Sequence, residues 1–409
     1  MAQTRATDAR RIRRHNELSI LSTLRYSGSA SRPEIARRVA LTLQAVNGIF
    51  EYLLDLGLVA EEGKRVGAVG PPSTVYGLNP TGAYAIGLDI SFDKLEAAII
   101  NFKGQMIYRV QTDYERPEPL LIQAAVDKSL KSLKSYMQRS DLDADRIVGI
   151  GLIEPGFIKN MTDLRGDLLD GAQMWKDQSI KNIMPDWLDL PLYIEPSPVV
   201  SALSMKVFSE KKMPSSYLFL SIGHAIEGCL VLNGDVHKGG TERAGKIGAI
   251  PVRIDEKGTV VTVRDVSSFS ILHERLLASG DHVLTTEDFY RAVHKQPMVV
   301  ENWMKDASEA IFMGILAVQA VSDVATVYLQ IAPPNMIGEA MVEKIRTGFA
   351  ALTNKDISIP DIHLSHSPSI APALGAASIV LYEHFSPKLD RITDVKRAME
   401  RILPLMGAA

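Results

Sequence analysis

The sequence predicts an α/β protein in which a compact helical unit precedes a larger body of alternating strands and helices. Two observations carry this prediction. Residues 31–57 read as two helices joined by a very short turn. From about residue 80 onward, apolar strand-like runs alternate with amphipathic helical stretches, and a second such set begins near Tyr217. We therefore expect the body to contain two α/β lobes of related content.

The helical unit has recognisable capping residues. Ser31 and Glu34 form a capping box, in which each side chain satisfies a free backbone N–H, at the start of a helix expected over 33–39. After a two-residue turn, Thr42 can cap a second helix that runs to about residue 56. Apolar residues at helical spacing form the expected core: Ile35, Val39, Val46, Ile49, Phe50, Leu53 and Leu54.

This pattern leaves Leu43, Gln44 and Asn47 outside the core, at the start of the second helix. A helix-turn-helix presents these positions to base edges in the major groove of DNA. We expect Gln44 and Asn47 to read bases and Leu43 to contact a thymine methyl group. The alternative is a helical hairpin that binds nothing.

Charge is unevenly distributed along the chain. The total is −3, but residues 1–50 carry nine basic and three acidic side chains, a net charge of +6, so the rest carries −9. A basic end on an acidic body suits a protein in which only that end touches phosphates. Residues 1–14 are expected to be a basic arm for the phosphate backbone or the minor groove, or else a disordered tail.

A wing is expected to complete the unit. A first helix over 17–25 precedes the pair, and short strands at 58–60 and 73–78 flank a polar turn that carries Lys64 and Arg65 at its tip. Three helices and a hairpin make a winged helix-turn-helix. The predicted DNA-binding residues are Arg32, Arg37, Thr42, Leu43, Gln44, Asn47, Lys64 and Arg65.

Composition limits the class of protein. The 409 residues include 46 % hydrophobic and 23 % charged side chains, which is ordinary for a globular chain. No apolar run approaches the roughly 18 residues of a membrane span, and the Arg-rich start does not resemble a secretory signal. A single cysteine, Cys229, excludes an internal disulfide. We expect a cytoplasmic protein without membrane contact.

The expected domains are residues 1–79 for the winged helix, 80–197 for the first lobe and 198–386 for the second. A last helix over about 387–409 is expected to pack back on the first lobe. In the first lobe, three meandering strands precede strands separated by helices, which predicts a mixed sheet with helices on its faces.

Several motifs, taken in order, resemble the ROK family of sugar kinases and sugar-responsive repressors. They are the helix-turn-helix itself, IGLDI at 86–90, GIGLIEPGFI at 149–158, YIE at 193–195, NGDVHKGG at 233–240, AGKIG at 244–248 and GAASIVLYEHF at 375–385. The resemblance covers nearly the whole chain. It implies a two-lobed actin-like, ribonuclease H-like body, and its repressor branch carries a winged helix ahead of that body.

Departures from the kinase motifs predict that the body has no catalytic residues. The family's glycine-rich phosphate turn becomes Asp89-Ile90-Ser91-Phe92-Asp93, where Phe92 fills space and Asp93 repels phosphate. The second phosphate turn, over 223–228, has also lost most of its glycines. The aspartate that serves the family as general base is replaced by Ser197, and a neutral serine cannot take a proton at neutral pH. We therefore expect neither kinase activity nor a cofactor.

The family's metal and sugar ligands are altered as well. Its histidine in Glu-x-Gly-His is replaced by Ala249, and no cysteine follows Cys229, so we expect no zinc. The resemblance implies a pocket with altered residues, which would bind a small-molecule effector. This effector would be a sugar derivative, an anion or another kind of small molecule. The alternative is a relic cleft whose polar groups pair with one another. Candidate ligand-binding residues are Trp175, Glu195, Ser197, His224, Arg243 and Lys246.

These observations predict a sequence-specific transcriptional regulator, a repressor, that binds double-stranded DNA at a palindromic operator as a homodimer or homotetramer. Two other functions stay open. One is a sugar kinase with a DNA-binding domain, and the other is a regulator whose body docks a protein partner.

Overall fold

The computed structural model describes residues 2–65, 72–91, 93–155, 174–175, 178–185, 189–208, 213–223, 225–241, 244–283, 286–331, 335–352, 356–365 and 372–387, with side chains omitted at 2–10, 206–208, 286–287 and 335–336. The chain divides into two compact units. The first comprises Met1–Lys212 and Ser369–Ala409, and the second comprises Met213–Pro368.

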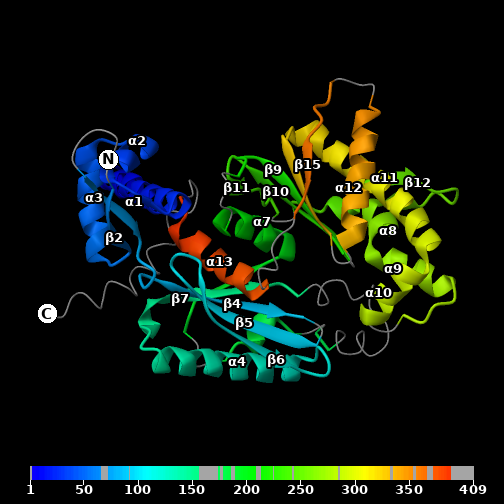
Figure 1. Cartoon of the computed structure of the whole chain (residues 1–409), viewed down its shortest axis with the longest axis horizontal. Helices are drawn as coiled ribbons and strands as arrows, with labels where there is room; N and C mark the ends of the chain where they lie inside the picture. The colour runs from blue at the N-terminus through cyan, green and yellow to red at the C-terminus, as the bar shows by residue number, and fades with distance from the viewer. Residues whose placement is uncertain are drawn as a thin grey trace. The chain divides into compact units, whose positions relative to one another are not determined.

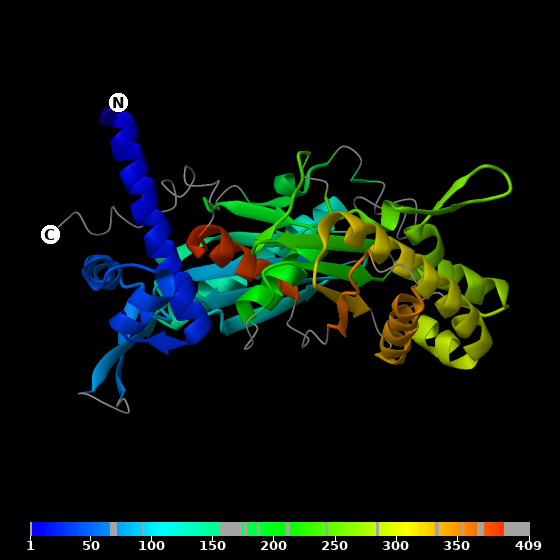
Figure 2. The same cartoon turned by 90° about the horizontal axis from the view of Figure 1, so that it is seen from above.

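The first unit begins with a winged helix, as predicted. Its elements are α1 (Ala2–Ser27), β1 (Ser29–Ala30), α2 (Arg32–Val39), α3 (Leu43–Asp55), β2 (Val59–Arg65) and β3 (Ser73–Leu78). The strands form a sheet in the order β1-β3-β2. Figures 1 and 2 show the three helices gathered together and the β2–β3 hairpin projecting away from them.

The expected basic arm is instead the first part of α1, which runs without interruption from Ala2 to Ser27. Neither glycine nor proline occurs before Gly28, so nothing in the sequence breaks the helix. Arg13 and Arg14 each pair with Glu17 at 3.2 Å, one turn along the same helix. The clustered arginines therefore predicted the positive charge of this segment correctly. The segment is helical, however, and is not a separate arm or a disordered tail.

The wing also differs from the expected one. β2 continues through Arg65, so Lys64 and Arg65 pair with Thr74 and Ser73 within the hairpin and do not form its tip. The hairpin connection, residues 66–71, lies outside the described residues. A register shift between Glu61 and Gly63 accommodates the longer strand.

The first lobe has a five-stranded mixed sheet in the order β6-β5-β4-β7-β8. Its strands and main helices are β4 (Tyr84–Ile90), β5 (Lys94–Asn101), β6 (Met106–Asp113), α4 (Pro119–Arg139), η1 (Ala144–Arg146), β7 (Ile147–Ile153), η3 (Ile180–Ile183), β8 (Leu192–Glu195), α7 (Ser197–Phe208) and α13 (Pro372–Phe385). α4 covers one face of the sheet and α13 covers the other (Figure 1).

Two strand glycines explain how closely α13 approaches the sheet. A Cβ atom on Gly87 of β4 would collide with the backbone of Ala373, and one on Gly151 of β7 would collide with that of Ala376. The helix therefore lies directly on the strands. The expected second lobe, residues 198–386, differs from the compact unit at both ends, because α7 and α13 pack on each other and α13 packs on the first sheet. The helix predicted over 387–409 falls almost wholly outside the described residues.

The second unit repeats the topology of the first, with a mixed sheet in the order β11-β10-β9-β14-β15. Its elements are β9 (Tyr217–Ile222), β10 (Ile226–Leu232), β11 (Asp235–Val236), η4 (Ile247–Ala249), β12 (Pro251–Ile254), β13 (Val260–Thr262), α8 (Val263–Ser267), α9 (Phe269–Ala278), α10 (Thr286–Lys295), α11 (Pro297–Ser322), β14 (Thr326–Ile331), α12 (Asn335–Ala350) and β15 (Asp361–Leu364). The predicted Asn233-Gly234 turn has positive φ at both residues, as a tight hairpin requires. Across the described helices, none is both long and apolar enough to cross a membrane.

Candidate nucleic-acid interface

Hydrogen bonds fix the start of α2 and the turn between α2 and α3. The Glu34 carboxylate accepts from the backbone N–H and the hydroxyl of Ser31, at 2.8 and 2.9 Å, and these bonds lower its pKa. Ala40 takes the left-handed conformation, with φ 54°, and ends α2. Thr42 Oγ1 then accepts from the N–H of Ala45 at 3.2 Å and begins α3. The predicted caps are confirmed.

The N-terminal half of α3 presents an open face. Leu43 is 46 % exposed, Gln44 is exposed and Asn47 is half-buried, while Val46 and Phe50 on the opposite side are fully buried. The positive end of the helix dipole lies at this same end. The first turns of α3 can therefore enter a groove without uncovering the core.

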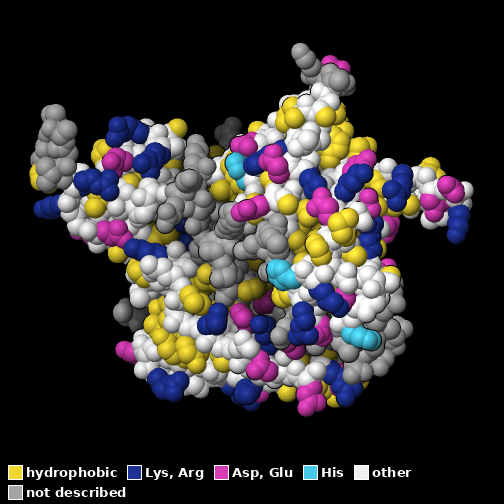
Figure 3. All heavy atoms as spheres, turned by 45° about the vertical axis from the view of Figure 1, so that its right-hand side comes forward, with side chains coloured by type: hydrophobic (Ala, Val, Ile, Leu, Met, Phe, Trp, Pro, Cys, Tyr) yellow, Lys and Arg dark blue, Asp and Glu magenta, His cyan; other side chains and the backbone are white. Residues whose placement is uncertain are grey.

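Basic side chains surround this face. Figure 3 shows Lys and Arg side chains gathered over the winged helix, at the upper left of the view. Arg37 and Lys64 are exposed, and within the described residues neither forms an ion pair. Arg65 is half-exposed, pairs with Glu34 at 3.6 Å and donates to Ser29 Oγ at 3.1 Å. Among the basic residues predicted to bind DNA, Arg37 and Lys64 are thus the ones most available to phosphates.

Arg32, another residue predicted to bind DNA, is less exposed than Arg37 and Lys64. Its side chain is 21 % exposed and pairs with Glu51 of α3 at 2.9 Å. Its guanidinium lies over the rings of Phe50 and Tyr76, at 5.4 and 4.9 Å from their centroids. Glu51 was missed in the sequence, although its position one turn beyond Asn47 places it on the same face of α3.

The winged helix shares a hydrophobic core with the first lobe. Leu21, Leu24 and Phe50 of the helices belong to one cluster with Phe102 of the lobe and Phe385 of α13. The rings of Phe102 and Phe385 meet edge to face at 4.6 Å between centroids. The winged helix is therefore packed on the lobe and is not tethered by a flexible linker.

Two arginines add polar links to this junction. Arg25 of α1 donates to the carbonyl of Phe102 at 2.9 Å, and burial lowers its pKa from 12.5 to about 10. Arg146 of η1 donates to the carbonyl of Gly82 at 3.1 Å and contacts that of Leu56 at 3.5 Å. Both arginines were absent from the predicted site, because their partners are remote in sequence.

The predicted ligand-binding residues are divided between the first unit, the second unit and the residues that the structure does not describe. In the first unit, Trp175 is 2 % exposed and its indole N–H donates to the carbonyl of Pro117 at 2.7 Å, so its side chain is part of the core. Glu195 ends β8 and Ser197 begins α7 close by. Lys246 is exposed in the second unit. His224 and Arg243, like Phe92, lie outside the described residues.

Asp89 ends up in an unusual setting for a carboxylate. It lies near the end of β4 beside Glu96 of β5, its cross-strand partner. Burial first, and then the Glu96 charge, raise the pKa of Asp89 from 3.8 to about 6. The half-buried Asp89 and the buried Glu96 place two carboxylates at this point, which disfavours an anionic phosphate and agrees with the altered turn in the sequence. Among the described residues, no three His, Cys, Asp or Glu side chains gather as a metal site would need.

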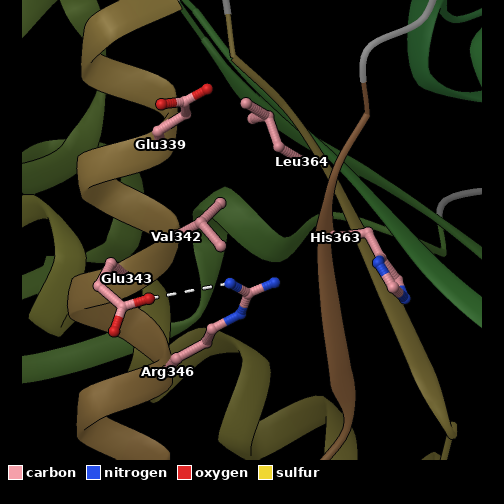
Figure 4. Close-up of a pocket in the computed structure, with 6 residues that line it drawn as sticks. All are labelled: Glu339, Val342, Glu343, Arg346, His363 and Leu364. Atoms are coloured by element: carbon pink, nitrogen blue, oxygen red, sulfur yellow. Dashed lines mark ion pairs between the residues drawn. The ribbon is translucent and has the colours of Figure 1, made fainter.

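A surface hollow of about 570 Å³ lies on the second unit between α12 and β15 (Figure 4). It is lined by Glu339, Val342, Glu343, Arg346, His363 and Leu364. Arg346 pairs with Glu343 at 3.8 Å and also donates to the carbonyl of Ile362, while His363 faces Asp361 at 2.8 Å. Two of its charged groups, Arg346 and Glu343, thus pair with each other, and none of the predicted ligand residues lines it.

Comparisons with known proteins agree with this architecture. The xylose repressor of Bacillus subtilis is 20 % identical over 389 residues, which cover 93 % of this chain and 98 % of that protein. Among solved structures, a ROK family transcriptional regulator homologous to the Mlc protein of E. coli matches with a TM-score of 0.66 at 16 % identity, covering 96 % of this chain and 99 % of that one. The ROK hexokinase of Thermus thermophilus matches with a TM-score of 0.52 at 18 % identity, covering 73 % of this chain and 98 % of that one.

The hexokinase match places the body in the actin-like sugar kinase fold, as expected, and the regulator match extends through the winged helix. The sequence profile of the ROK family matches residues 85–383, which is most of the chain. The chain therefore belongs to the ROK family.

Proposed function

We propose that this protein is a DNA-binding transcriptional repressor of the ROK type. The observation that carries the proposal is the open face of α3, where Leu43 and Gln44 are exposed and Asn47 is half-buried, together with exposed basic side chains on the same winged helix. A winged helix with this arrangement places the start of α3 in the major groove and its hairpin on the adjacent backbone. The sequence match to a xylose repressor, which covers 93 % of the chain, supports the same function.

Selection of bound fragments from genomic DNA by the purified protein tests this proposal. We expect enrichment of one palindromic sequence, because a two-fold symmetric dimer presents two α3 helices to two half-sites. Binding to random DNA with equal affinity would contradict it. A dimer or tetramer should be visible by light scattering at the concentrations used for binding.

We further propose that the body does not catalyse phosphoryl transfer. Ser197 stands at the start of α7, where the resemblance places the general base, and a hydroxyl cannot take a proton at neutral pH. The carboxylates of the half-buried Asp89 and the buried Glu96 disfavour a phosphate nearby. ROK sugar kinases are relatives as well, so ATP turnover should be measured with a panel of sugars. Turnover that is lost on changing Glu195 would favour the kinase alternative.

The body is proposed to sense a small molecule, and the relative's name makes pentoses the first ligands to try. Glu195 and Ser197 are the candidate contacts of the first unit, and Lys246 is that of the second. Because the winged helix is packed on the first lobe, an effector that moves this lobe would move α3 with it. Operator affinity measured with and without each saturating sugar tests this coupling, and an unchanged affinity would count against it.

A further inference from the structure

We infer that Arg32 is a positioning residue, which determines how Asn47 presents its amide to a base and makes guanine its preferred partner. The inference rests on the proposed function, since it concerns the residue expected to read the operator. Its basis is the junction of Arg32, Asn47 and Glu51 on the outer side of α2 and α3, with Phe50 and Tyr76 beneath it.

The side chain of Arg32 is held in place from several directions. Aromatic rings lie under its guanidinium, at 5.4 Å for Phe50 and 4.9 Å for Tyr76. Its Nη1 atom pairs with Glu51 Oε1 at 2.9 Å and lies 3.5 Å from Asn47 Oδ1. Only 21 % of the Arg32 side chain is exposed, and the two rings cover its guanidinium, so Arg32 is less available to phosphates than an exposed arginine.

The chemistry of arginine determines the orientation of Asn47. A guanidinium only donates hydrogen bonds, so the atom of Asn47 that faces it must be the carbonyl oxygen Oδ1. The Nδ2 group, with its two N–H donors, is then the part left to face the groove. Asparagine reads adenine by using both of its polar atoms, one accepting and one donating. With Oδ1 turned toward Arg32, Asn47 acts as a donor.

A donor matches a base edge that carries acceptors. Guanine presents two of them in the major groove, O6 and N7, whereas the adenine edge combines an acceptor with an N6 donor. Arg32 also neutralises Glu51, whose side chain is 64 % exposed on the same side of α3 and would otherwise repel phosphates. One arginine thus serves two purposes at the face that enters DNA.

The test uses the full-length protein and its selected operator. Each base pair of one half-site is replaced in turn, and affinities are measured for the native protein and for Arg32→Gln. We expect the variant to lose about tenfold in affinity for the native operator and to shift its preference from guanine to adenine at one position. Its affinity for random DNA and its salt slope should change little. The double variant Arg32→Gln/Asn47→Ala should show the same base preferences as Asn47→Ala alone.

Glu51→Gln provides a second variant that removes the ion pair at an exposed position. It should fold normally and give a smaller shift at the same base pair. A uniform loss on every sequence, with a salt slope reduced by about one, would show that Arg32 contacts a phosphate and would overturn the inference. Unchanged base preferences in both variants would overturn it too. A native protein without sequence preference would instead refute the proposed function itself.

Discussion

Replacing Phe102 by alanine tests whether the winged helix and the first lobe form one cooperative unit. The Phe102 ring is fully buried between Arg25 of α1, at 5.2 Å, and Phe385 of α13, at 4.6 Å. Truncating a buried phenylalanine costs about 3–5 kcal/mol, and losing the cation–π contact adds about 1 kcal/mol. Because this ring touches elements of both parts, we expect both to be destabilised together.

Hydrogen exchange measured by mass spectrometry reports on each part separately. In Phe102→Ala, exchange should accelerate about a hundredfold or more in α1 and in β4 and β5, since opening costs less free energy. Phe219→Ala is the matched control, because this phenylalanine is equally buried in β9 of the second unit. It should accelerate exchange in β9 and β10 and leave α1 unchanged. Acceleration confined to the lobe in Phe102→Ala, with α1 still protected, would refute the shared core.

Three further predictions concern single substitutions. Because the pKa of Asp89 is raised to about 6, the folded protein holds an extra proton between about pH 4 and pH 6, and the stability that this group contributes falls as the pH rises through that window. Asp89→Asn should therefore raise the free energy of unfolding at pH 8 by at most about 3 kcal/mol, which is measured as a higher melting temperature. At pH 4 the melting temperature should change little. A Cβ on Gly48 of α3 would meet nothing within 4 Å, so Gly48→Ala should stabilise this exposed helix by about 0.5–1 kcal/mol, and a lower melting temperature would contradict that reasoning. Arg65→Gln should weaken binding to any DNA and lower the salt slope by about one, whereas an unchanged slope would show that Arg65 is occupied by Glu34 and Ser29 alone.

Local rules of helix and strand formation explain the parts of the fold that the sequence predicted well. The caps at Ser31 and Thr42 and the Asn233-Gly234 turn depend on neighbouring residues, and all three occur as expected. The order of strands and helices also follows from periodicity, so the mixed sheet of the first lobe could be anticipated.

Contacts between remote residues account for what the sequence did not reveal. Arg32 was predicted to bind DNA, and nothing nearby in the chain indicates that Tyr76 and Glu51 close around it. α13 follows the second lobe in sequence but packs on the first sheet. The sequence signal for this packing is the pair of strand glycines, Gly87 and Gly151, which leave room for the helix backbone. Trp175 was a candidate ligand-binding residue, yet its indole N–H donates to Pro117, which belongs to another part of the lobe. Pairings of this kind depend on tertiary packing.

The affinity of Asn47→Ala for the selected operator and for random DNA tests the central claim most directly. Asn47 stands on the face of α3 proposed to read bases, so its removal should cost about 1–3 kcal/mol on the operator and almost nothing on random sequence. The native protein measured in the same salt provides the reference for both. An equal loss on the two DNAs, or none on either, would contradict base reading by this helix.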